Sequence, residues 1–271
     1  MSLIKSRIKQ IEINFQTLLA PPPYAHEYQL VIDFSDQLQT SFRIRYTERE
    51  QLTEEEIVEE GFTLYDDFEW KGTLPKAWKP AILDVVANTN HLFDAPKAES
   101  QQVLELKLDY ENNETENGIP DNLESWEYFS QEIIQAVYEI SKKELPLEIS
   151  YVEQSGNDKQ LIRIQPRFSH RSLTVTREKD GKKEEKSLKW DQLMSLLQTV
   201  YLPDYDPEKA KNKLPNKPGK YIDQGDGLWY KLGNAVSNPS KKKDALGELE
   251  KMFRSFFSGL LFFFQLHHFL L

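Results

Sequence analysis

Alternation of apolar and polar residues predicts β-strands in the first third of the chain. Apolar side chains occupy every second position over residues 11–15, which is the period of a strand with one buried face. The segments 28–34 and 41–46 alternate in the same way and are joined by a short polar stretch, so they predict a hairpin. The segment 101–110 alternates most clearly, with leucines on one side and charges on the other.

The same pattern predicts further strands elsewhere. Residues 62–70 are interpreted as a strand that ends at Trp70, and residues 147–153 and 160–168 as two more strands. The segment 172–190 predicts a hairpin, because its central Asp180-Gly181 pair suits a type I′ turn. The chain therefore carries strands in both halves.

Apolar residues spaced three and four positions apart predict the helices. The strongest pattern covers residues 125–144, and weaker ones cover 75–93 and 190–200. A short helix is predicted at 53–60, where Thr53 is followed three positions later by a glutamate, the pattern of a capping box. Both halves thus run through a hairpin, a strand near a tryptophan and then a helix, which indicates either an internal repeat or ordinary β-β-α recurrence.

These elements predict an α+β fold in which helices pack on one face of antiparallel β-sheets, with two lobes and an apolar C-terminal helix. Residues 1–110 are expected to form an acidic, β-rich lobe. The polar segment 111–121 is expected to be a linker or an exposed loop, because it lacks apolar periodicity. Residues 122–271 are expected to form the second lobe, which contains a long lysine- and proline-rich loop at 201–240.

The C-terminal segment has a helical apolar stripe from Leu246 to Phe264, and residues 256–271 are apolar almost all round. As a helix, the segment 256–271 would rise about 24 Å, which is less than the rise of the roughly 20-residue helix that spans a bilayer. An apolar helix of this kind must be covered. Its own domain, an oligomer or protein partner, and a membrane surface are the three alternatives.

Composition and charge narrow the class of protein. The 271 residues are 39% hydrophobic and 29% charged, which excludes wholesale disorder, collagen-like sequence and a polytopic membrane protein. The net charge of −10 is unevenly distributed: residues 1–135 carry 11 Lys/Arg against 26 Asp/Glu, and residues 136–271 carry 23 against 18. The segment 48–69 alone holds ten carboxylates against one arginine. It is either a solvated acidic face or a surface complementary to the basic half.

Familiar catalytic motifs are absent from the sequence. The chain has no cysteine, which excludes disulfides, thiol nucleophiles and thiolate metal sites, and it has no phosphate-binding glycine loop and no nucleophile or zinc motif. We therefore expect no cofactor and no metal, and the sequence favours a non-catalytic protein. The first residues lack a continuous apolar segment, so a cytoplasmic protein is the default expectation. We also expect a bacterial protein.

One arrangement offers an enzymatic alternative. Asp94, Glu105 and Lys107 have the spacing of a weak Asp…Glu-x-Lys pattern, in which two carboxylates hold Mg²⁺ and the lysine steadies a water or phosphate. The pattern resembles that of metal-dependent nucleases in spacing only, since Phe93 stands where those enzymes have proline. The simpler interpretation is that Glu105 and Lys107 belong to the solvent face of a strand.

The leading hypothesis is an accessory or assembly protein that engages a protein partner or a second copy of itself through its basic loop and its apolar C-terminal helix. Aromatic side chains in an exposed loop often anchor a partner. The expected partner-binding residues are Lys209, Lys211, Lys213, Lys217, Lys220, Trp229, Tyr230, Phe253, Phe256, Phe257, Leu260 and Phe264. Nucleic acid is the alternative partner, because lysines neutralise phosphates and aromatic rings stack on unpaired bases. Membrane association through the C-terminus is a weaker alternative.

Overall fold

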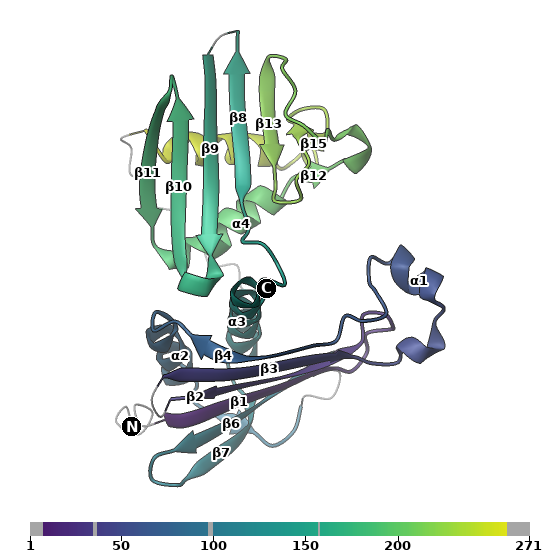
Figure 1. The fold of residues 1–271 in the computed structure, drawn as a ribbon, viewed down its shortest axis with the longest axis vertical. Helices are drawn as coiled ribbons and strands as arrows, with labels where there is room; N and C mark the ends of the chain where they lie inside the picture. The colour runs from purple at the N-terminus through teal and green to yellow at the C-terminus, as the bar shows by residue number, and fades with distance from the viewer. Residues whose placement is uncertain (1–7, 35–36, 97–99, 157, 259–271) are drawn as a thin grey trace. The chain divides into compact units, whose positions relative to one another are not determined.

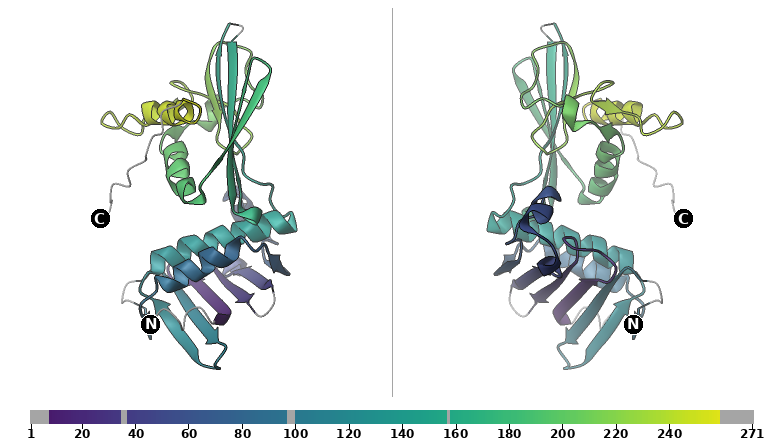
Figure 2. Two further views of the ribbon diagram at one scale, coloured as in Figure 1. Left: turned by 90° about the vertical axis from the view of Figure 1, so that its left-hand side faces the viewer. Right: turned by 90° about the vertical axis from the view of Figure 1, so that its right-hand side faces the viewer.

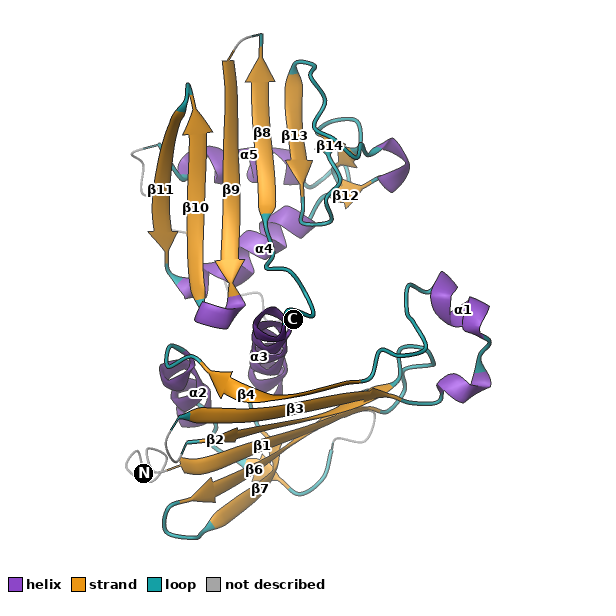
Figure 3. Cartoon of the chain, viewed as in Figure 1, coloured by secondary structure: helices purple, strands orange, loops and turns teal. Residues whose placement is uncertain are grey.

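The computed structural model describes residues 8–34, 37–96, 100–156 and 158–258 (Figure 1). The chain divides into two compact units. Unit 1 comprises the described residues up to Leu145 together with Phe168–Arg171, and unit 2 comprises Pro146–Arg167 and the described residues from Ser172 onward. Both units combine antiparallel sheet with helices, as Figure 3 shows, so the predicted α+β class is confirmed.

Unit 1 is built on a seven-stranded antiparallel sheet with the order β4-β3-β2-β1-β6-β7-β5. The strands are β1 (Ile8–Thr17), β2 (His26–Asp33), β3 (Leu38–Tyr46), β4 (Phe68–Leu74), β5 (Leu92–Phe93), β6 (Gln102–Tyr110) and β7 (Thr115–Pro120). The first four strands form a meander, and β6 returns to pair with β1. The alternation of apolar and polar residues along β1, β2, β3 and β6 gives this sheet one apolar and one polar face.

Helices cover the apolar face of this sheet (Figure 2). They are α2 (Trp78–Ala87) and α3 (Leu123–Ser141), whose tryptophans Trp78 and Trp126 are fully buried. The insertion between β3 and β4 carries η2 (Arg49–Gln51) and α1 (Glu54–Glu59). The predicted capping box of α1 is confirmed, since Thr53 and Glu56 bond each other's backbone N–H groups.

A segment distant in sequence completes unit 1. The one-turn 3-10 helix η3 (Phe168–His170) follows β9 in the chain but belongs to this unit. The indole N–H of Trp78 donates a hydrogen bond to the carbonyl of Phe168. Arg171 pairs with the buried carboxylate of Glu132 at 3.5 Å and lies over the ring of Trp78.

Unit 2 is built on a six-stranded antiparallel sheet with the order β11-β10-β9-β8-β13-β14, beside a separate two-stranded ladder of β12 and β15. The strands are β8 (Ile149–Ser155), β9 (Asp158–Arg167), β10 (Ser172–Lys179), β11 (Lys182–Leu188), β12 (Asp204–Tyr205), β13 (Gly219–Asp223), β14 (Tyr230–Lys231) and β15 (Val236–Ser237). The predicted turn at Asp180-Gly181 is confirmed. Both residues have the positive φ of a type I′ turn.

The helices of unit 2 pack on one face of its sheet (Figure 2). They are α4 (Leu193–Tyr201), preceded by η4 (Trp190–Gln192), and α5 (Ala245–Ser255); η5 (Pro207–Lys209) lies in the connection after α4. The ring of Phe253 on α5 stacks on Tyr151 of β8 with centroids 4.6 Å apart. Both rings are almost completely buried, so this pair belongs to the unit's apolar core.

The two units repeat one topology. In each, a four-stranded meander is followed by a helix, a two-residue strand, a return strand that pairs with the first strand, at least one further strand and a final helix. The order β4-β3-β2-β1-β6 in unit 1 therefore corresponds to β11-β10-β9-β8-β13 in unit 2. The similar element order that the sequence indicates extends to the pairing of the strands.

Three sequence-based predictions are corrected. The segment 111–121 is neither a linker nor a boundary: it forms the β6–β7 turn and then β7, and the division of the chain falls at Leu145. The segment 62–70 is strand only from Phe68, because the side chain of Asp66 ties the preceding residues into a loop. The segment 201–240 is no structureless loop, since it contains β13, which pairs with β8.

Candidate functional site

The lysine-rich segment of unit 2 follows η5 and leads into β13. Its lysines divide into two kinds. Lys209 pairs with Asp206 at 2.5 Å, a hydrogen bond that raises the pKa of Lys209, and Lys220 pairs with Glu250 of α5. Lys211, Lys213 and Lys217 are exposed, and none forms a side-chain hydrogen bond or ion pair with any residue that the structure describes. The same holds, within the described ranges, for Lys241, Lys242 and Lys243 before α5.

The backbone of this segment is held in place by contacts within unit 2. Lys211 and Trp229 exchange two backbone hydrogen bonds, of 3.0 and 2.8 Å. The side-chain amide of Gln154 on β8 donates to the carbonyl oxygens of Pro215, at 2.7 Å, and of Lys217. The phenol of Tyr221 also donates to the Lys217 carbonyl. The exposed lysines are therefore presented on an ordered backbone.

Several aromatic residues expected to contact a partner lie inside unit 2. Tyr230 is buried and donates a hydrogen bond to Asp226, and Phe253 and Phe256 are buried beneath the sheet. Phe257 is half-buried under the guanidinium of Arg177. Tyr230, Phe253 and Phe256 pack in the core of their own unit, which corrects the expectation that they form a contact surface. Trp229 is half-buried, whereas Leu260 and Phe264 lie outside the described residues.

Leu249 and Met252 of α5 are buried as well. The first part of the apolar stripe that begins at Leu246 is therefore covered within unit 2. Within the ranges that the structure describes, no helix combines the length and apolar character needed to cross a membrane.

Asp94, Glu105 and Lys107, the residues of the enzymatic alternative, do not lie on neighbouring strands. Glu105 and Lys107 lie on the polar face of β6, and Lys107 pairs with Asp109 at 3.4 Å. A hydrogen bond from Thr115 and this lysine hold the pKa of Asp109 below its usual range, against the effect of burial. Asp94 follows β5, which is separated from β6 by β7. In the described part of the chain, no group of three or more His, Asp or Glu side chains is placed to hold a metal ion.

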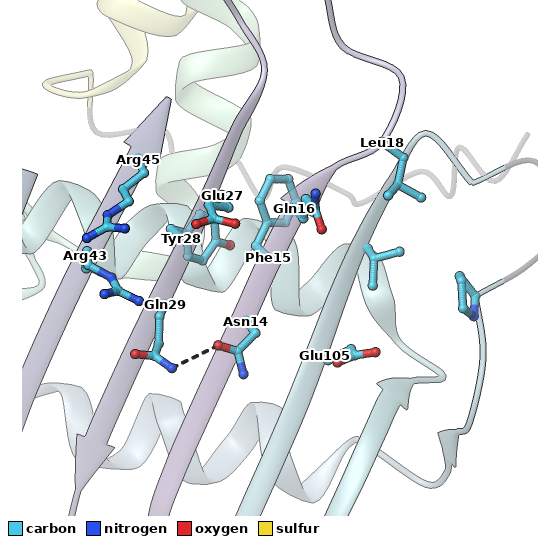
Figure 4. Close-up of a pocket in the computed structure, with 12 residues that line it drawn as sticks. Asn14, Phe15, Gln16, Leu18, Glu27, Tyr28, Gln29, Arg43, Arg45 and Glu105 are labelled. Atoms are coloured by element: carbon cyan, nitrogen blue, oxygen red, sulfur yellow. Dashed lines mark hydrogen bonds between the residues drawn. The ribbon is translucent and has the colours of Figure 1, made fainter. Parts of the chain in front are cut away.

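A groove lies on the polar face of the unit 1 sheet and has a volume of about 330 Å³ (Figure 4). Two rows of side chains form its floor across four neighbouring strands. One row runs Arg43, Gln29, Asn14 and Glu105, each residue directly opposite the next in the strand register. The second row runs Arg45, Glu27, Gln16 and Val103 in the same manner. Leu18 and Pro96 border the groove beside β6.

The arginines of this groove were not predicted from the sequence. Arg43 and Arg45 occupy the polar positions of a strand that the alternation does predict. Their importance depends on the neighbouring strands, because the order β3-β2-β1-β6 places Gln29, Asn14 and Glu105 beside them. The only local signal is that two arginines alternate with apolar residues on one strand.

The acidic segment between β3 and β4 is organised around Arg49. Its guanidinium donates to Asp66 at 2.8 Å and to the carbonyl of Thr63, and lies over the rings of Tyr46 and Phe62. Burial raises the pKa of Asp66, but hydrogen bonds from Thr63 and Arg49 outweigh it and hold that pKa below the usual range. Most carboxylates of α1 and its flanks point to solvent, so the segment is an acidic surface of unit 1.

Comparison of the chain with protein-family models, with curated proteins and with solved structures finds no match.

Proposed function

We propose that the protein is a non-catalytic interaction protein that binds an acidic partner protein through the exposed lysines of unit 2. The binding residues are Lys211, Lys213 and Lys217, together with the lysines at 241–243. The observation that carries the proposal is that these six ammonium groups have no carboxylate partner in the described part of the chain. Lys209 and Lys220 are excluded from the surface because each is already paired.

The contrast between these unpaired lysines and the acidic net charge of the chain supports this assignment. The whole chain carries a net charge of −10, so carboxylates that could neutralise the six lysines are abundant. Charges of one sign gathered on exposed segments steer a partner of opposite sign and select against partners of like sign. An acidic protein surface is therefore the complementary partner.

The ordered backbone supports it as well. Binding costs less conformational entropy when the contacting segment is already held in one conformation. The Lys211–Trp229 ladder and the Gln154 amide provide this order for residues 211–217. Trp229 is half-buried and adjoins Lys211 through the backbone, so it offers an apolar contact beside the charges.

The test compares charge-matched variants of the full chain as bait. Wild type, the triple variant K211Q/K213Q/K217Q and a control triple variant of exposed unit 1 lysines, K71Q/K76Q/K79Q, are incubated with lysate of the source organism, both untreated and treated with nuclease. We expect an acidic protein to be retained by wild type and by the control, and to be lost from the first variant. Retention should also fall at high salt, because exposed charge pairs are screened.

Two outcomes contradict the proposal. Equal capture by all three baits shows that the lysines are not the contact surface. Capture that disappears with nuclease treatment shows that the lysines bind nucleic acid, and the alternative partner class is then correct.

A further inference from the structure

We propose that the groove on the polar face of the unit 1 sheet is a binding site for a short zwitterionic peptide. The peptide's carboxylate would contact Arg43 and Arg45, and its ammonium group would contact Glu105. This site and the lysines of unit 2 are formed by different residues. Peptide binding in the groove and partner binding by the lysines are therefore tested independently.

The unpaired charges of the groove are separated along its length, and Glu27 lies opposite Arg45 at the arginine end. Figure 4 shows the guanidinium groups of Arg43 and Arg45 at one end of the rows and the Glu105 carboxylate at the other. The three strand spacings from β3 to β6 set the backbones of Arg43 and Glu105 about 14 Å apart. A ligand with one charge of each sign at its ends matches this arrangement, whereas a ligand with two like charges does not.

The charged groups at both ends of the groove are not paired with other side chains in the described part of the chain. Arg43, Arg45 and Glu105 form no ion pair and no side-chain hydrogen bond with any described residue, although Glu27 stands opposite Arg45 and Glu69 opposite Arg43 in the register. Arg43 is half-buried at the floor of the groove, where a guanidinium without a partner is less favourable than at the open surface. Two guanidiniums two residues apart on one strand face can bind one carboxylate from both sides.

A polar floor lies between the two charged ends of the groove. The amide of Gln29 donates to Glu12 at 2.8 Å and to Asn14 at 3.2 Å, and Asn14 also donates to Glu12 at 3.0 Å. These bonds fix both carboxamides. Within the described ranges the carbonyl oxygen of Gln29 accepts no hydrogen bond, so an acceptor is presented between the charged ends. A peptide backbone supplies N–H groups at this position, which an amino acid or a simple zwitterion lacks.

The dimensions select a short peptide. A volume of about 330 Å³ is at the small end of ligand sites. An extended chain advances at most about 3.3–3.6 Å per residue, so about three residues bridge the ends once the long arginine side chains have reached inward. The shape and the charges thus indicate a ligand of about tripeptide length.

The experiment measures binding of triglycine to the full chain by isothermal titration calorimetry and by NMR. Two capped probes isolate the ends: N-acetyl-triglycine lacks the ammonium group, and triglycine amide lacks the carboxylate. We expect saturable binding of triglycine, and a loss of at least about ten-fold for each capped probe, because a charge-assisted contact is lost. The control variant K71Q alters the polar face of β4 opposite Ser41, beyond the groove, and should bind as wild type does.

Variants then assign each end of the ligand to its residue. R43Q/R45Q should weaken triglycine by at least about ten-fold and have little further effect on triglycine amide, which has no carboxylate to lose. E105Q should weaken triglycine and have little further effect on N-acetyl-triglycine. Circular dichroism of each variant confirms that the unit is folded.

The proposal is overturned if triglycine shows no saturable binding at concentrations of about 10 mM, a limit that corresponds to negligible affinity. It is also overturned if the capped probes bind as well as triglycine, or if the arginine and glutamate variants weaken capped and uncapped probes equally.

Discussion

The buried carboxylate of Glu139 accepts a hydrogen bond of 2.9 Å from the backbone N–H of Ser169. Its other oxygen accepts from the preceding N–H, that of Phe168, at 3.2 Å. One side chain of α3 thus satisfies two backbone donors of η3, and both residues belong to unit 1. A buried carboxylate is tolerated in a core when its oxygens are bonded in this way.

Glu139→Gln should therefore destabilise unit 1 by about 2 kcal/mol, because hydrogen bonds to a charged acceptor are the stronger kind and the new amide NH₂ faces a backbone donor. Urea unfolding followed by tryptophan fluorescence measures the change, since Trp78 and Trp126 are buried in this unit. Glu124→Gln is the matched control, as Glu124 is exposed on the same helix. Equal unfolding midpoints for the two variants would show that the carboxylate contributes nothing.

The low pKa of Asp66 predicts a loss of stability in acid. A carboxylate whose pKa is lower in the folded state than in the unfolded chain stabilises the fold above the unfolded value, near 3.8, and this contribution disappears as the pH falls through the lower, folded value. Asp66→Asn should therefore lower the free energy of unfolding at neutral pH, and the difference from wild type should shrink below about pH 4.

Chemical unfolding at a series of pH values between neutral and strongly acidic measures this difference. Asp84→Asn is the control, because Asp84 is exposed on α2 and its carboxylate makes no hydrogen bond to a described residue. If the difference in unfolding free energy between wild type and Asp66→Asn stays constant with pH, Thr63 and Arg49 do not lower the pKa of Asp66.

The positive φ angles of the β10–β11 turn predict how substitutions there change stability. Gly181 has φ of 72° and Asp180 has φ of 51°, and a Cβ added at Gly181 would meet no atom within 4 Å. Gly181→Ala should therefore cost about 1 kcal/mol through the left-handed backbone alone. Asp180→Gly relieves that strain and should change stability little. Thermal unfolding compares the two, and a loss for Asp180→Gly as large as for Gly181→Ala would rule out a type I′ turn as the cause.

Periodic segments were the predictable part of the fold. The strands β1, β2, β3 and β6 bury every second side chain, so local alternation was sufficient to find them. β13 was missed because Tyr221 and Ile222 are both buried, which removes the alternation, and because its partner β8 lies far earlier in the chain. The segment 111–121 was misassigned since a hairpin turn and a linker have the same polar composition.

The candidate sites divide in the same way. The exposed lysines of unit 2 could be found by residue type alone, although their lack of carboxylate partners could not. The groove of unit 1 required the strand order, because Asn14 and Glu105 become neighbours only when β6 returns beside β1. Side chains that meet across strands are placed by tertiary pairing, which no local pattern specifies.

Phe253 offers the clearest distinction between a core residue and a contact residue. It is fully buried, and its ring stacks on Tyr151 at 4.6 Å with the planes 11° apart. Phe253→Ala should cost about 3–5 kcal/mol, since it leaves a cavity in the centre of unit 2. Phe257 is half-buried over Arg177, and Phe257→Ala should cost only about 1 kcal/mol through loss of the cation–π contact. Urea unfolding of both variants measures the ratio of the two losses in unfolding free energy. If Phe253→Ala unfolds like wild type but no longer captures the partner, Phe253 is a contact residue and not a core residue.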